Sequence, residues 1–117
     1  NKMATVFGKE LRKLRIDYDE TIYQMAKKLD MSISYLSAIE SGSRNVPGDL
    51  VDKLIEKYNL DSERSCTMKK AEAESAKELN INLKGISPEQ RRLIFALSRK
   101  LGNISDEECA DIARKLK

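Results

Sequence analysis

Two short amphipathic patterns separated by a tight turn constrain the fold of this chain more than any other feature. The patterns cover residues 22–29 and 33–41, and their apolar side chains recur at helical spacing. The turn between them is residues 30–32, where Asp30 is a residue that tolerates a positive φ. Start and stop signals mark both helices: a capping box of Thr21 and Gln24, an N-cap at Ser32 and a left-handed C-terminal residue at Gly42. The sequence therefore predicts two crossing helices, with the small Ala26 at their contact.

Two further helices are expected in the first 60 residues. The spacing predicts a helix over residues 3–16 and another over residues 49–58. The apolar positions expected to face inward are Met3, Phe7, Leu11 and Leu14 in the first helix and Leu50, Leu54, Ile55 and Tyr58 in the second. We therefore expect an all-α fold, in which residues 1–60 form a bundle of four to five helices as the first domain.

The composition changes after residue 60, and we expect residues 61–117 to form a separate C-terminal region. The segment 62–77 is highly charged and buries little, and alternation at residues 79–84 is typical of a short strand. Two amphipathic helices are predicted at about 88–101 and 106–116. Because a lone strand and two helices cannot form an independent core, we expect this region to dimerise. The predicted interface residues are Leu79, Ile81, Leu83, Leu93, Leu97 and Ile112.

Several classes of function are disfavoured by the residues that the chain lacks. The chain has no histidine and no glycine-rich phosphate loop, so nothing indicates a catalytic site, and we expect no enzyme. Cys66 and Cys109 stand far apart, which fits neither a metal site nor a disulfide framework. We therefore expect no metal and no cofactor. No apolar run is long enough to cross a membrane, and a cytoplasmic protein is expected.

An ordered set of short motifs lies between Phe7 and Leu60. The set consists of Leu11-Arg12-Lys13-Leu14-Arg15, Met25-Ala26-Lys27-Lys28-Leu29, Ser32, Leu36, Glu40-Ser41-Gly42 and Pro47. It resembles the helix-turn-helix domain of the XRE family, the phage-repressor and Cro-like bacterial regulators. The resemblance covers about half of the chain and implies a lambda-repressor-like bundle that binds double-stranded DNA. The less distinctive residues 61–117 resemble the tails of such regulators, for which no family function is inferred.

The resemblance also implies roles for individual residues. Residues 33–41 would be the recognition helix, with DNA base contacts from Ile33, Ser34, Tyr35, Ser37 and Ala38. Contacts to DNA phosphates would come from Arg12, Thr21, Tyr23, Gln24, Arg44 and Asn45, and a structural ion pair from Arg15 and Glu40. The alternative is an exposed helix face and a solvated loop charge at Arg44. The recognition face lacks Gln, Asn and Arg, so specificity is expected to depend on apolar contacts and DNA shape.

Two functional hypotheses follow. The first is a sequence-specific repressor that binds a palindromic operator as a homodimer and is associated with the nucleoid. The second is an antitoxin or inhibitor module, whose C-terminal region binds a partner protein such as a toxin or a peptidase while the DNA-binding domain regulates its own operon. A third class, an RNA-binding or purely structural bundle, also stays open. The net charge of +3 is small for a nucleic-acid-binding protein, so it discriminates weakly.

Overall fold

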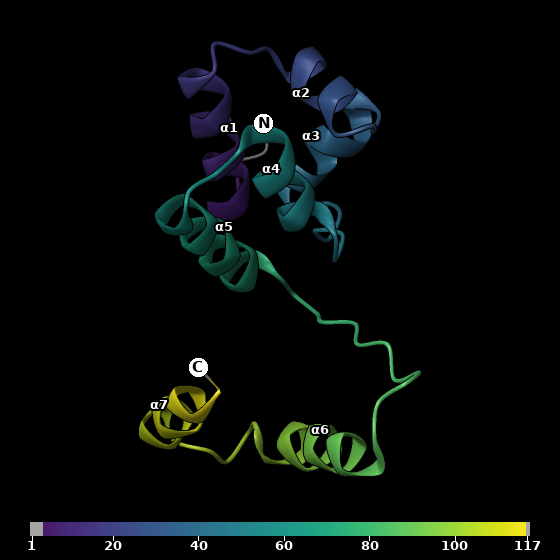
Figure 1. Ribbon diagram of the computed structural model, residues 1–117, viewed down its shortest axis with the longest axis vertical. Helices are drawn as coiled ribbons and strands as arrows, with labels where there is room; N and C mark the ends of the chain where they lie inside the picture. Colours follow the sequence, from purple (N-terminus) through teal and green to yellow (C-terminus); the bar gives the residue numbers. More distant parts are fainter. Residues whose placement is uncertain (1–3, 117) are drawn as a thin grey trace. The chain divides into compact units, whose positions relative to one another are not determined.

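The computed structural model describes residues 4–116 and contains only helices as regular secondary structure in that range (Figure 1). The chain divides after Asn80 into two compact units. The first unit contains α1 (Val6–Asp17), α2 (Ile22–Lys28), α3 (Ile33–Ser41), α4 (Leu50–Tyr58) and α5 (Ser62–Ser75). The second unit contains α6 (Pro88–Lys100) and α7 (Asp106–Lys115). The all-α prediction is confirmed for the described residues.

The predicted signals at the ends of α2 and α3 form the expected hydrogen bonds. The Thr21 hydroxyl accepts from the Gln24 amide at 3.2 Å, and the Gln24 side chain accepts from the Thr21 amide at 2.7 Å. Ser32 caps α3 by accepting from the Tyr35 amide at 3.1 Å. Gly42 ends α3 in the left-handed region with φ of 84°, and Asp30 in the turn has φ of 58°. These local signals fix the length of α3 and the direction in which it leaves the turn.

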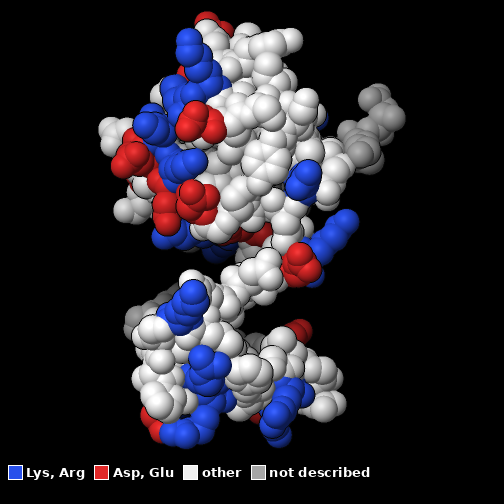
Figure 2. Space-filling model, turned by 90° about the vertical axis from the view of Figure 1, so that its right-hand side faces the viewer, with Lys and Arg blue, Asp and Glu red and all other residues white. Residues whose placement is uncertain are grey.

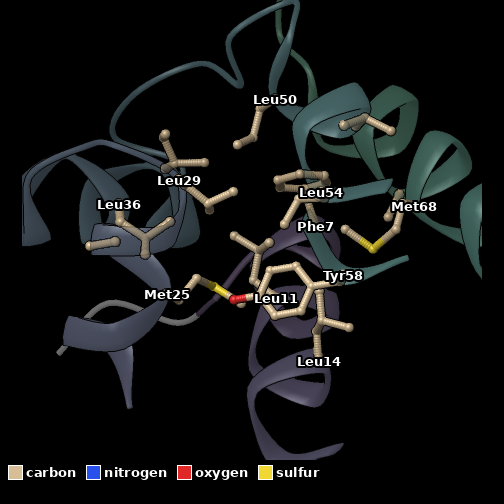
Figure 3. Close-up of a cluster of buried hydrophobic side chains, with 14 residues drawn as sticks. Phe7, Leu11, Leu14, Met25, Leu29, Leu36, Leu50, Leu54, Tyr58 and Met68 are labelled. Carbon is tan, nitrogen blue, oxygen red and sulfur yellow. The ribbon is translucent and has the colours of Figure 1, made fainter. Parts of the chain in front are cut away.

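One hydrophobic core joins the five helices of the first unit (Figure 3). The buried side chains include Phe7, Leu11 and Leu14 from α1, Met25, Ala26 and Leu29 around α2, Leu36 and Ile39 from α3, and Leu50, Leu54 and Tyr58 from α4. These residues belong to the predicted apolar stripes. Ile55, also predicted to face inward, is only partly buried, and Met3 lies outside the described residues. Burial of such side chains is the main favourable term in the stability of a bundle of short helices.

The fifth helix belongs to this core, although the sequence pattern indicated a segment that buries little. α5 packs against α1 and α4, and its Met68 and Ala71 are buried. The Ser75 hydroxyl at its end accepts a hydrogen bond from the Phe7 amide at 2.9 Å. The first compact unit therefore extends to Asn80, beyond the boundary that we expected at residue 60. α5 has only two buried apolar residues among its fourteen, so the helical periodicity of its sequence is weak. This weak periodicity explains why we expected the first domain to end before α5.

The strand expected at residues 79–84 is not present, and this prediction was wrong. The segment between α5 and α6 has no regular secondary structure. The Asn82 side chain instead accepts the Lys84 amide at 2.9 Å, and Gly85 adopts φ of 81° in the following turn. Alternation predicts which side chains share a face, but a strand also needs a neighbouring backbone. Asparagine favours a local turn where that neighbour is lacking.

The second unit consists of two helices with well-formed ends. Ser87 and Gln90 form a capping box with Pro88 at the first position of α6, and Ser105 caps α7. None of the described residues in this unit is buried, including Cys109 and the predicted interface residues Leu93, Leu97 and Ile112. Separately, none of the helices in residues 4–116 has the length and apolar character needed to cross a membrane.

Candidate nucleic-acid interface

α3 presents one side to the core and the other to the surface. Leu36, Ile39 and Glu40 are buried, whereas Ser34 and Ser37 are exposed. Of the other predicted base-contact residues, Ile33 is exposed, and Tyr35 and Ala38 are partly buried. All five residues belong to a single helix of nine residues, a size that fits the major groove of B-DNA. Their side chains offer hydroxyl groups and small apolar groups, which can contact base edges and thymine methyl groups.

Tyr35 has a structural role in addition to its predicted DNA contact. Its ring packs against the core, and the Arg44 guanidinium lies 5.8 Å from the ring centroid. The Arg44 amide also donates to the Ala38 carbonyl at 3.1 Å, which attaches the loop after α3 to the helix. The ring thus supports an arginine whose charge lies at the end of α3. This packing means that removal of the whole Tyr35 side chain would disturb the fold as well as the surface.

A hollow lies between α1 and the exposed side of α3. Its volume is about 480 Å³, and it is lined by Arg12, Ser34, Ser37, Ala38, Glu40, Ser41 and Ser43. The Arg12 side chain is 54% exposed, and its Nε lies 3.4 Å from the Glu40 carboxylate. An arginine with this exposure has room to reach a phosphate beside the α3 surface. The hollow therefore places one predicted phosphate contact, Arg12, beside three predicted base contacts, Ser34, Ser37 and Ala38.

The predicted ion pair between Arg15 and Glu40 joins α1 to the end of α3. Arg15 donates from Nη1 to one carboxylate oxygen of Glu40 and from Nη2 to the other at 3.1 Å. Glu40 is 3% exposed, and the Arg15 side chain is 12% exposed. The Glu40 carbonyl also accepts the Thr5 amide at 2.9 Å, and an ideal Cβ on Gly8 would lie 2.2 Å from that carbonyl. These contacts hold α3 close against α1 and fix its orientation.

The remaining predicted phosphate contacts lie on the surface but differ in how their side chains are used. Thr21, Tyr23 and Gln24 are exposed at the start of α2, with Thr21 and Gln24 engaged in the capping box. Asn45 is exposed, and its amide donates to the Glu78 carbonyl at 3.2 Å. Asn45 therefore also holds the segment that follows α5. The Tyr23 side chain is 67% exposed and is therefore accessible to a phosphate.

A cluster that the sequence pattern did not indicate supports the turn before α2. The Tyr58 hydroxyl donates to Glu20 at 2.6 Å, and Lys28 forms an ion pair with Glu20 at 2.6 Å. Lys28 also lies 4.1 Å from the centroid of the Tyr58 ring, and Tyr18 packs edge-on against that ring. Burial alone would raise the pKa of Glu20, but the bonds from Lys28 and Tyr58 outweigh it and lower the pKa. No sequence spacing links Glu20 to Tyr58, so only the fold brings them together.

The exposed side of α3 has no charged side chain. α3 contains no Lys or Arg, and its one acidic residue, Glu40, is buried. In the view of Figure 2, a broad uncharged area of the first unit borders a band in which basic and acidic side chains alternate. Arg12 and Arg44 are the predicted cationic contacts that flank α3. Base contacts from α3 would therefore be neutral, with charge supplied from its edges.

The five-helix unit, with α3 exposed after a short turn from α2, defines a helix-turn-helix DNA-binding domain. Residues 9–64 match the helix-turn-helix family model. This part of the chain belongs to the XRE family of helix-turn-helix proteins, and the chain is a DNA-binding transcriptional regulator. The family is one of regulatory domains and not of enzymes, and the match does not favour the alternative of an antitoxin module. No curated protein and no solved structure matched the chain.

Proposed function

We propose that the protein is a sequence-specific repressor that binds a palindromic operator as a homodimer. The observation that carries this proposal is the exposed side of α3, held rigidly by the buried Arg15–Glu40 pair. In this proposal Ser34 and Ser37 donate or accept hydrogen bonds at base edges, and Ile33 and Ala38 contact thymine methyl groups. The Tyr35 hydroxyl reaches a base or a phosphate. Few base pairs contact a helix of this length, so a second copy is needed for high specificity.

Contacts to the phosphates would place α3 in the groove without reading the sequence. Arg12 and Arg44 provide the charges at the two sides of α3, and the exposed residues Thr21, Tyr23, Gln24 and Asn45 provide neutral contacts. Each phosphate neutralised by an arginine releases counterions, so binding weakens as salt increases. Because the α3 surface itself is uncharged, we expect a shallower salt dependence than that of a strongly basic DNA-binding protein.

The segment that leads from the first unit to α6 is long enough for two associated copies to reach two half-sites of an operator. The first unit ends at Asn80, and residues 81–87 lead from it to α6; they span at most about 25 Å in each copy when fully extended, or about 50 Å for two copies together. Half-sites one helical turn apart are separated by about 34–36 Å. Two copies that associate through their C-terminal residues can therefore each place an α3 on the same face of DNA. Such a complex would repress by covering a promoter.

The test is selection of bound duplexes from random DNA, followed by footprinting of the enriched sequence. We expect a palindrome with half-sites about one turn apart. Substitution of Ser37 with alanine should weaken binding to that palindrome by about tenfold and leave binding to random DNA unchanged, because each of the two half-sites loses a hydrogen bond that contributes about 0.5–1.5 kcal/mol. Ser98→Ala, at an exposed helical serine of α6, is the matched control.

A second variant separates the surface role of Tyr35 from its packing role. Tyr35→Phe keeps the ring beneath Arg44 but removes the hydroxyl, so the fold should be unchanged while operator affinity falls. Enrichment of no common sequence, or full operator affinity in both Ser37→Ala and Tyr35→Phe, would contradict the proposed recognition surface.

A further inference from the structure

The two helices of the second unit enclose an open apolar groove. Its volume is about 520 Å³. The lining residues are Leu93, Ala96, Leu97 and Lys100 of α6, Asn103 and Ile104 of the connection, and Glu108, Ile112 and Leu116 at α7. Most of its accessible lining is therefore contributed by aliphatic side chains from both helices.

The apolar side chains of this unit remain in contact with solvent. Leu93 is 63% exposed, Leu101 is 62% exposed and Leu116 is 78% exposed, and no described residue of the unit is buried. A unit of this size without a core is not stable alone, because it buries too little apolar surface to offset its conformational entropy. The two capped helices thus require a further surface that covers their apolar sides.

The charges of the two helices indicate what that surface is. α6 carries four basic side chains and one acidic side chain, a net charge of +3. α7 carries four acidic and two basic side chains, a net charge of −2. A second copy of the unit, related by twofold symmetry, can place its α7 on α6 and its α6 on α7, so that both contacts join opposite charges. Pairing of α6 with α6 would instead join like charges.

We propose that the groove between α6 and α7 is filled by the same unit of a second copy, with α6 of each copy against α7 of the other. This inference rests on the proposed homodimer and names its surface and pairing. Lys100 and Glu108 are the charged residues that line the groove, one from each helix. They determine the pairing of the helices, while Leu93, Leu97 and Ile112 supply apolar contact area.

Charge reversal in the full chain, with sedimentation velocity over a range of concentrations, tests the pairing. Lys100→Glu and Glu108→Lys should each raise the dimer dissociation constant by roughly tenfold, because symmetry places the altered contact in the interface twice. An equimolar mixture of the two variants should recover a dimer of near wild-type affinity, since every α6–α7 contact between them again joins opposite charges. Only pairing between chains predicts recovery on mixing.

The controls are the neighbouring charges that do not line the groove. Arg99→Glu changes α6 by the same charge as Lys100→Glu, and Glu107→Lys changes the first turn of α7 as Glu108→Lys does. Both controls should weaken the dimer less than the groove variants. Leu97→Asp should give a monomer whose first unit unfolds as in the wild type.

Two results would overturn this inference. One is a full chain that stays monomeric at high micromolar concentration, which would leave the groove to a different protein. The other is a dimer unaffected by Leu97→Asp and by both charge reversals. Selection of DNA sequences by the wild type is measured separately: a groove-dependent dimer that selects no sequence would refute the proposed repressor, and a sequence-selective protein that dimerises elsewhere would refute only the groove.

Discussion

Removal of the Glu40 carboxylate tests whether the ion pair between α1 and α3 holds the DNA-binding domain together. Glu40→Ala leaves the Arg15 guanidinium, in a side chain only 12% exposed, without its carboxylate. An uncompensated charge at such a position costs about 3–5 kcal/mol. The Arg12 contact to the same carboxylate adds little, because the Arg12 side chain is 54% exposed. A unit of this size has a total stability of about 4–12 kcal/mol, so the variant loses a large part of it.

Urea and thermal unfolding of the full chain, followed by circular dichroism, measure this loss. For a domain of this size, a cost of about 3 kcal/mol lowers the midpoint temperature by at least about 12 °C. The double variant Arg15→Leu/Glu40→Leu should be more stable than Glu40→Ala, because it leaves no buried charge unpaired. Lys13→Ala, which removes the exposed pair with Glu10 on the same helix, should change stability by less than about 1 kcal/mol. A loss of stability below about 1 kcal/mol in Glu40→Ala would refute the proposed role of the Arg15–Glu40 ion pair.

Three further predictions follow from close contacts and from titration. Gly8→Ala should cost about 1–3 kcal/mol and weaken DNA binding, because its Cβ meets the Glu40 carbonyl, whereas the matched Gly48→Ala has open space and should be neutral. Equal midpoints of thermal unfolding for Gly8→Ala and Gly48→Ala would contradict this prediction. The pKa of Glu20 is lower in the folded protein than in the unfolded chain, where it is near 4.5. The ionised Glu20 carboxylate therefore stabilises the fold at pH values above about 4.5, and this stabilisation is lost as the pH falls through the folded pKa. Glu20→Gln should therefore be destabilised relative to the wild type at pH 7, and the difference between the two should shrink as the pH falls below about 4.5. Burial, and then the nearby Asp52, raises the pKa of Glu72, so Glu72→Gln should be more stable than the wild type at pH 7, with no gain below about pH 4.5. Unfolding by urea at several pH values checks both, and parallel pH profiles for wild type and variant would count against either.

Local sequence signals predicted most of the first unit because they act over three or four residues. The capping box at Thr21, the cap at Ser32 and the left-handed Gly42 fix where α2 and α3 begin and end. The apolar spacing of α1 and α4 identified the core side chains for the same reason, since helical period alone decides which face they share. The short alternation at residues 79–84 misled us because a strand depends on a partner backbone that no local signal supplies.

The sequence by itself determined the helices, their caps and which side of α3 is apolar, because neighbouring residues on one chain decide these properties. The tertiary structure decided which residues of different helices contact each other. It joined α5 to the core through Met68, brought Glu20 to Tyr58 across 38 residues, and placed Arg12 beside the exposed serines of α3. Burial, hydrogen bonding and pKa shifts depend on such distant neighbours, and helical period contains no information about them.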